Sequence, residues 1–374
     1  NINVTEKSTG SVQFGAGVSS SEGIILGVTV NQNNFLGTGN RVSANVNTGS
    51  VNTTYALSFT DPYFTPDGVS RGFDIYRRDV DTGSLNTTGN YNSSSYGVGV
   101  KFGIPVNERD AWSAGLTFDT TQIDLNSNSP FQYRDYCSKI SGGGFNGCTV
   151  NSWVLNLGWT HDTRDNILYP SNGVLQRITA DVGLPGLDLD YFKLDYKHTW
   201  FKSLSKNITL MLSGEAGYGD GYGGDQYPFF KNFYTGGVNS VRGYKTSSIG
   251  ARALQLNRNN GNINNYAVGG TKLLVGNAEV FFPVPFLKDS KQFRLSVFLD
   301  AGTVWGISPS ILSSGQVAAP DTCDGASDCL RYSTGLGVSW YSPFGPIKVV
   351  LAKALNTNQD DQTEILQFQL GSSF

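Results

Sequence analysis

The segment RYSTGLGVSWY, residues 331–341, alternates between bulky and small side chains. Its even positions run from Tyr332 through Leu336 to Trp340, whereas the odd positions between them hold serine or glycine. A period of two residues places neighbouring side chains on opposite faces of a β-strand. The segment therefore predicts a strand that has one apolar face and one polar face.

Segments near both ends of the chain alternate in the same way. The apolar positions are Val12, Phe14, Ala16 and Val18 at the start, Phe293, Leu295, Val297 and Leu299 further on, and Leu366, Phe368 and Leu370 at the end. The positions between them are mostly glycine, serine, threonine, asparagine and glutamine. Because this period recurs along the chain, we predict an all-β protein.

The composition excludes several classes of protein. Charged residues make up only 15% of the 374 residues, and the net charge of −3 gives no basic surface for nucleic acid. The sequence has no run of about eighteen apolar residues, so we expect no membrane-spanning helix. Disorder is also excluded, because 39% of the residues are hydrophobic and they follow a regular period.

Tryptophan lies toward one end of the apolar faces. Four tryptophans have the apolar-face parity, and each lies near a short connection: Trp112, Trp159, Trp200 and Trp340. Tryptophan is enriched where a membrane meets water, whereas a core residue has no reason to choose the short-turn end. This placement favours a membrane barrel over a soluble β-sandwich. A propeller is also disfavoured, because the sequence shows no blade repeat.

Short and long connections alternate along the chain. The long connections fall at about residues 79–90, 121–151, 220–270, 304–330 and 356–362. Short turns on one side and long loops on the other are typical of outer-membrane barrels, which have an even number of strands. We therefore predict an antiparallel transmembrane β-barrel of about sixteen strands, with short periplasmic turns and long extracellular loops. Both chain ends are then expected on the periplasmic side.

The four cysteines form two close pairs, Cys137 with Cys148 and Cys323 with Cys329, and both lie in loops rich in glycine, serine or aspartate. Two local disulfides formed in an oxidising compartment are the preferred interpretation. A zinc site is the alternative, although no CxxC spacing or nearby histidine supports it. A second possible metal site, WTHDTRDN at residues 159–166, is better explained as the cap of a turn.

The stretch GGVNSVRGYKTSSIGAR, residues 236–252, has no apolar period and lies in a long segment of low hydrophobicity. A structureless segment of that length inside a compact domain is usually either functional or disordered. So long a loop also needs an anchor, because ordering it is costly in conformational entropy.

Several motifs along the chain carry a family resemblance. They are NFLGTGN at 34–40, DPYFTPDGVS at 61–70, VRGY at 241–244, GNAEVFFPVPF at 276–286, VFLDAGTVW at 297–305, SPFGPIKVVLAKAL at 342–355 and FQLGSSF at 368–374. Together they resemble the BamA family, whose barrel is the centre of outer-membrane protein assembly. The resemblance implies that residues 1–8 are the remnant of a periplasmic POTRA domain or its linker. It implies that residues 9–374 form the barrel, with a loop at about 221–268 folding into the lumen.

The resemblance assigns the signature of this loop to Val241, Arg242, Gly243 and Tyr244, and it implies that the arginine meets acidic residues of the barrel wall. Glu279 and Asp300 fit that role, because both alternate onto the polar side of neighbouring strands. The planar guanidinium of Arg242 suits carboxylates. A solvated loop arginine and ordinary polar residues of the lumen are the alternatives.

For function, the resemblance implies an insertase that folds client barrel proteins and inserts them through a seam between its first and last strands. The candidate seam residues are Gln13, Gly15, Gly17, Gly371, Ser372 and Phe374. Glycine weakens strand pairing, and an opened seam offers an edge on which a client strand can be added. The implied partners are outer-membrane lipids, unfolded barrel clients and accessory lipoproteins, in the outer membrane of a Gram-negative bacterium.

Other functions stay open at this point. A POTRA-type polypeptide transporter, of two-partner secretion or the TamA branch, has the same kind of barrel. A passive porin needs an open lumen, whereas a long loop is expected to fill this one. An outer-membrane hydrolase usually needs a histidine in the lumen or at the rim, but His161 and His198 both have lipid-facing parity. We expect no catalytic residue, metal or cofactor.

Overall fold

The protein is described by a computed structural model in which residues 9–140, 142–256, 263–284, 293–306, 323, 325–342, 345–358 and 361–371 are placed. The segment 1–8, expected to be a POTRA remnant or linker, lies outside these residues, so that expectation stays a prediction.

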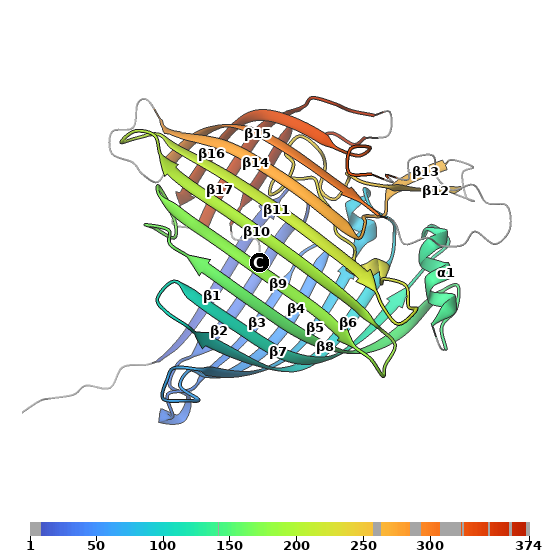
Figure 1. Ribbon diagram of the computed structural model, residues 1–374, viewed down its shortest axis with the longest axis horizontal. Coiled ribbons are helices and arrows are strands. Elements are labelled where there is room, and N and C mark those ends of the chain that lie inside the picture. The colour runs from blue at the N-terminus through green and yellow to red at the C-terminus, as the bar shows by residue number, and fades with distance from the viewer. Residues whose placement is uncertain are drawn as a thin grey trace, which may run out of the picture.

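Sixteen antiparallel strands close into one barrel, in which each strand pairs with its neighbours in chain order and the last pairs with the first (Figure 1). The first eight are β1 Gly10–Ser19, β2 Gly23–Gln32, β3 Arg41–Thr48, β4 Asn52–Asp61, β5 Ser70–Asp81, β6 Asn92–Pro105, β7 Asp110–Asp124 and β8 Gly147–Asp162. The others are β9 Gly173–Leu184, β10 Tyr191–Ser203, β11 Thr209–Gly221, β14 Lys272–Pro283, β15 Phe293–Trp305, β16 Arg331–Ser342, β17 Gly345–Ala354 and β18 Leu366–Leu370. The predicted fold class and strand number are confirmed.

The two faces of the wall differ as the alternation predicts. Phe14, Trp112 and Leu336 lie on the outer face and are more than half exposed, whereas Asp300 and Ser333 face inward and are fully buried. In hydrocarbon every backbone N–H and C=O must find a partner within the protein, and a closed barrel satisfies that demand. Within the described residues, no helix is both long and apolar enough to cross a membrane.

The long connections contain regular structure that the sequence analysis missed. The expected loop at 121–151 is shorter, because β7 and β8 extend into it and it contains helix α1, Phe131–Lys139. The connection between β11 and β14 contains the one-turn helix η3, Phe229–Lys231, and a hairpin of β12, Arg252–Leu256, and β13, Ile263–Ala267. Two further short helices are η1, Phe35–Gly37, and η2, Thr82–Leu85. Helix α1 and the hairpin lie at the same end of the barrel (Figure 1).

An aromatic cluster holds α1 over that end. The rings of Tyr133 in α1 and Phe229 in η3 stack with centroids 4.0 Å apart, and Tyr91 and Tyr136 meet Phe229 edge-on. Aromatic pairs in these geometries stabilise a fold beyond the area that they bury. The short α1 therefore depends on tertiary packing, which explains why its own sequence pattern did not reveal it.

Both expected disulfides are present. The Cα atoms are 5.2 Å apart in Cys137–Cys148, which joins α1 to β8, and 5.5 Å apart in Cys323–Cys329. The zinc alternative is therefore wrong, since all four thiols are used in covalent bonds. Within the described part of the chain, no group of three or more potential ligands could hold a metal ion.

Replacing Cys137 and Cys148 together by serine should destabilise the α1 segment by about 3 kcal/mol, because the disulfide restricts a short loop of the unfolded chain. Hydrogen exchange should accelerate at α1 and η3 but not in the barrel strands β7 and β8. The control is Ser138→Ala, at an exposed position of α1 whose hydroxyl donates to the Asp135 carbonyl, and it should change stability by less than about 0.5 kcal/mol. Equal exchange in the control and the double variant would contradict this role.

Candidate functional site

Two neighbouring strands bring the acidic residues of the lumen together. In the pairing of β14 with β15, Asn277 is opposite Asp300 and Glu279 is opposite Phe298. Residues two apart on one strand share a face, so all four side chains point into the lumen. The carboxylates of Glu279 and Asp300 thus lie diagonally across one strand pair and are buried.

Arg242, in the connection between β11 and β14, reaches both carboxylates. Its Nε and Nη2 each donate to Asp300 at 2.7 Å, and its Nη1 donates to Glu279 at 2.8 Å. The Arg242 and Glu279 side chains are 3% and 6% exposed, and that of Asp300 is fully buried. A two-pronged contact of this kind is specific to arginine, because lysine presents only a point charge.

The charge of this arginine is maintained despite its burial. Burial by itself lowers the pKa of the Arg242 guanidinium, but its hydrogen bonds and its attraction to Asp300 and Glu279 raise the pKa above the ordinary value. The guanidinium also lies over the ring of Phe298, with Cζ 3.4 Å from the centroid. Such cation–π contact compensates part of the lost hydration.

The backbone next to Arg242 is tied to the last strand. Gly243 has a φ of +88° and donates its N–H to Gln367 Oε1 of β18 at 3.0 Å. Gln367 Nε2 in turn donates to the Tyr244 carbonyl at 2.8 Å, and the Tyr244 hydroxyl donates to the Asn356 carbonyl at 2.6 Å. The positive φ suits glycine, and a Cβ at Gly243 would also crowd Ala352 and Ala354 of β17.

These contacts extend the site beyond the residues singled out from the sequence. Asn277 Nδ2 donates to Asp300 at 2.9 Å and to the Ser240 carbonyl at 2.7 Å, and Lys348 Nζ donates to the Val238 carbonyl at 2.9 Å. The alternation of β15 could have identified Phe298 as a site residue, because this aromatic side chain falls among the polar, lumen-facing positions of the strand. The loop therefore connects β14, β15, β17 and β18 from inside the lumen.

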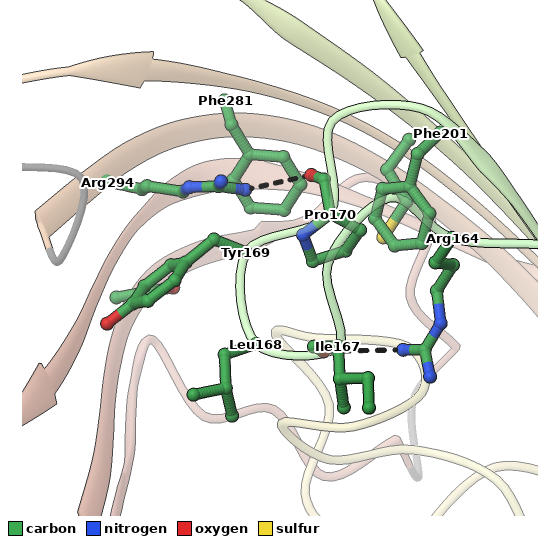
Figure 2. A pocket seen from close by; sticks show the side chains of 10 residues that line it. Arg164, Ile167, Leu168, Tyr169, Pro170, Phe201, Phe281 and Arg294 are labelled. Carbon is green, nitrogen blue, oxygen red and sulfur yellow. Dashed lines mark hydrogen bonds between the residues drawn. The ribbon is translucent and has the colours of Figure 1, made fainter.

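A second connection narrows the mouth of the lumen at the other end. Residues 163–172, between β8 and β9, reach across to β15, where Arg294 Nη1 donates to the Pro170 carbonyl at 3.2 Å (Figure 2). A cavity of about 240 Å³ lies between this connection and the inner wall. Its lining includes Leu168, Tyr169, Phe201, Met211 and Phe281. The sequence analysis did not anticipate this apolar patch in a polar lumen.

Within the described part of the chain, the seam between the first and last strands is short. Strand β1 pairs with β18 at two described positions, Val18 with Leu370 and Ser19 with Gln369, but with β2 at ten. The Gly371 N–H donates to the Pro346 carbonyl at 2.9 Å, and this glycine has a φ of +84°. The chain therefore turns at Gly371 in a conformation that other residues rarely adopt.

The six expected seam residues do not all meet. Gln13 and Gly15 pair with Thr29 and Gly27 of β2 and have no described partner on β18. Gly17 and Gly371 do approach: a Cβ on Gly17 would lie 2.6 Å from the Leu370 carbonyl oxygen, and one on Gly371 2.8 Å from that of Ala16. Ser372 and Phe374 lie outside the described residues. The register therefore places Gly371 against Ala16 and Gly17 and not against Gly15.

These features define a class: an outer-membrane β-barrel with a short closing seam and a lumen occupied by its own anchored loop. An Omp85 superfamily domain matches residues 34–374. The chain belongs to this superfamily, and the resemblance to the BamA family is confirmed. It is an outer-membrane protein of the kind found in Gram-negative bacteria.

The relatives include the outer membrane protein assembly factor BamA of Neisseria meningitidis, which is 36% identical over all of this chain and 48% of its own length. A SAM50-like protein of Schizosaccharomyces pombe is 24% identical over all of this chain and 74% of its own. The crystal structure of Haemophilus ducreyi BamA lacking POTRA domains 1–3 matches with a TM-score of 0.88 and 27% identity, covering 99% of this chain and 71% of that one. The chain spans about half the length of the BamA relatives that it matches.

Arg242→Ala should release the loop, because removing one partner of a buried ion cluster leaves uncompensated charge and costs about 3–5 kcal/mol. Residues 236–252 should become accessible to external protease, while the barrel keeps its heat-resistant mobility on a gel. Arg242→Lys should restore protection only in part.

The matched control is Lys245→Ala, which removes an exposed cation from the same loop and should leave protection unchanged. If Arg242→Lys protects the loop as well as arginine does, the two-pronged geometry is not what anchors it.

Proposed function

We propose that this barrel folds other β-barrel proteins and inserts them into the outer membrane through the seam between β1 and β18. The observation that carries the proposal is the pairing of β1 with β18 at two described positions, compared with ten between β1 and β2. The assembly-factor names of the relatives support the same function.

The mechanism is strand addition. Among the described residues, Gly10–Ala16 of β1 have register partners on β2 and none on β18. An unpaired edge is a template for another strand, which supplies the missing backbone hydrogen bonds. In lipid this pairing is strongly favoured, because hydrocarbon offers no other partner for peptide groups. An unfolded client would therefore pair its first strand with β1 before the client is released from the barrel into the membrane.

The loop that carries Arg242 supports one side of this seam. Its contact with Gln367 ties β18 to the ion cluster on β14 and β15. When the seam opens, β1 therefore moves away from β18, which the loop holds in place. At Gly371 the described end of β18 is held by β17, because the Gly371 N–H donates to the Pro346 carbonyl.

The partners follow from this mechanism: unfolded barrel clients at the seam, and lipids around the outer face. Accessory lipoproteins are a further proposed partner, mainly through the POTRA domains that the family resemblance implies. Two alternatives are weaker. CdiB from Acinetobacter baumannii shares the fold with a TM-score of 0.54 at 14% identity, and that likeness carries no argument for secretion. The anchored loop in the lumen disfavours a passive porin.

A disulfide across the seam should block client insertion. Val18→Cys with Leu370→Cys introduces cysteines at register partners, whose spacing suits a disulfide. Cross-linked protein should lose most assembly activity in cells and regain it on reduction. The control is Val18→Cys with Ile24→Cys, which locks β1 to β2 instead and should leave activity intact. Full activity in a completely cross-linked Val18–Leu370 population would refute the seam mechanism.

A further inference from the structure

The connection between β8 and β9, residues 163–172, is a rigid turn. Asn166 Oδ1 accepts hydrogen bonds from the backbone N–H groups of Leu168 and Tyr169, both at 2.9 Å. Asp165 Oδ1 accepts from the N–H groups of residues 171 and 172 at 2.8 and 3.1 Å. Asparagine and aspartate side chains that bind nearby backbone in this way fix the conformation of a turn. The turn is therefore ordered by its own side chains.

The tip of this turn presents apolar side chains at the mouth of the lumen. Ile167 is 74% exposed and Leu168 is 55% exposed, and both line the cavity of about 240 Å³. The other side of the cavity is formed by the lumen-facing side chains of Phe201, Met211 and Phe281 (Figure 2). Exposed apolar side chains on a rigid turn lower the cost of binding, because little order has to be gained. This surface is therefore preorganised for an apolar guest.

The size of the cavity limits what it can hold. A cavity of about 150 Å³ accommodates a benzene molecule, whereas sites for drug-sized molecules have about 300–1,000 Å³. The volume of about 240 Å³ lies between these values and fits one aromatic side chain. The lining suits such a guest, because the rings of Tyr169 and Phe281 and the thioether of Met211 make favourable contacts with a further ring.

Arg294 connects the two sides of the cavity. Its Nη1 donates to the Pro170 carbonyl of the turn at 3.2 Å. Its Cζ lies 5.4 Å from the ring centroid of Tyr169 in the turn and 5.7 Å from that of Phe281 in the wall. These contacts hold the turn at a fixed distance from the wall, so the cavity is preformed.

A row of lumen-facing residues joins this cavity to the seam. In register order across β15, β16, β17, β18 and β1, the row consists of Arg294, Ser339, Lys348, Gln369 and Ser19. The first two of these residues also line the cavity. The row crosses four strand spacings, about 19 Å, which an extended chain covers with about six residues. A peptide that is paired at the seam can therefore extend along the wall to the cavity.

We infer that this cavity binds an aromatic side chain from an extended segment of an unfolded barrel client. The inference rests on the proposed function, because this segment adjoins the client strand that is paired on β1. Every second residue of such a segment is apolar and must be kept from water until the client is inserted. The wall residues of the cavity face the lumen, so lipid at the outer face cannot occupy it. The aromatic side chain thus has a protected place about six residues from the seam.

Fluorescence anisotropy of the full chain in lipid nanodiscs tests the inference. The probe is a fluorescein-labelled peptide with the sequence of residues 331–341, which has the alternation of a barrel strand. The comparison peptide has alanine in place of Tyr332, Trp340 and Tyr341. After subtraction of binding to empty nanodiscs, the aromatic peptide should bind about tenfold more tightly, which is the effect of burying one aromatic side chain. Leu168→Asp should abolish this preference, because a carboxylate in the lining disfavours an apolar guest.

The matched control is Leu204→Asp, which places the same charge at a residue that is 59% exposed on another short connection, that between β10 and β11. This variant should keep the preference. Folding of every variant is checked by heat-resistant mobility on a gel. Equal affinity of the unaltered protein for the two peptides, or a preference that survives Leu168→Asp, would overturn the inference. The peptide would then be bound elsewhere on the barrel.

The disulfide-locked variant with Val18→Cys and Leu370→Cys separates this inference from the proposed function. It should keep the tenfold preference for the aromatic peptide, because the cavity lies on β10–β16, although it should no longer insert clients. Insertion by the locked variant would contradict the seam mechanism alone. Blocked insertion together with equal affinity for the two peptides would contradict the role of the cavity alone.

Discussion

Hydrocarbon offers no hydrogen-bond partner to a peptide group, and this constraint determines the architecture of the protein. Each strand must be paired on both sides, so the sheet closes on itself. Fifteen of the sixteen junctions satisfy the demand with five or more register pairs, and the junction of β1 with β18 has two in the described residues. Within the described residues this junction has the fewest ladder pairs, and it is where we propose that a client strand is added. The constraint that closes the barrel is thus the same one on which the proposed strand addition depends.

The ion cluster in the lumen must compensate for the hydration that its charged groups lose on burial. A guanidinium and two carboxylates lose hydration when buried, and only close geometry repays this. Arg242 meets that requirement with three charged hydrogen bonds between 2.7 and 2.8 Å, a fourth from its backbone N–H to Asp300 at 3.1 Å, and an aromatic face. Such a cluster is stable only within a narrow range of distances and orientations. It therefore selects one position for a loop that could otherwise occupy many, and it links the wall at β14 and β15 to the last strand.

Much of the fold could be predicted from the sequence, because a period of two is visible wherever a strand has one lipid face. The alternation around Leu336 and the positions of Trp112 and Trp159 are local signals. They can be read from the sequence without knowledge of which strands pair. Helix α1 could not be predicted, since its stability comes from Phe229, about ninety residues away in the chain. The contact of Gly243 with Gln367 was equally out of reach, because the closure register decides which polar residue of β18 meets the loop. For the same reason parity alone could not decide whether Gly15 or Gly17 lies against Gly371.

The order of the chain gives the anchored loop one more property. Arg242 precedes its partner Asp300 by 58 residues, and Gly243 precedes Gln367 by 124. During synthesis or translocation Arg242 and Gly243 therefore emerge before the strands β15 and β18 that hold them. Long-range contacts of this kind form late, because the entropy of closing the intervening chain must be overcome first. The loop can reach its final position only after the last strand has joined the sheet, so its docking marks the completion of the barrel.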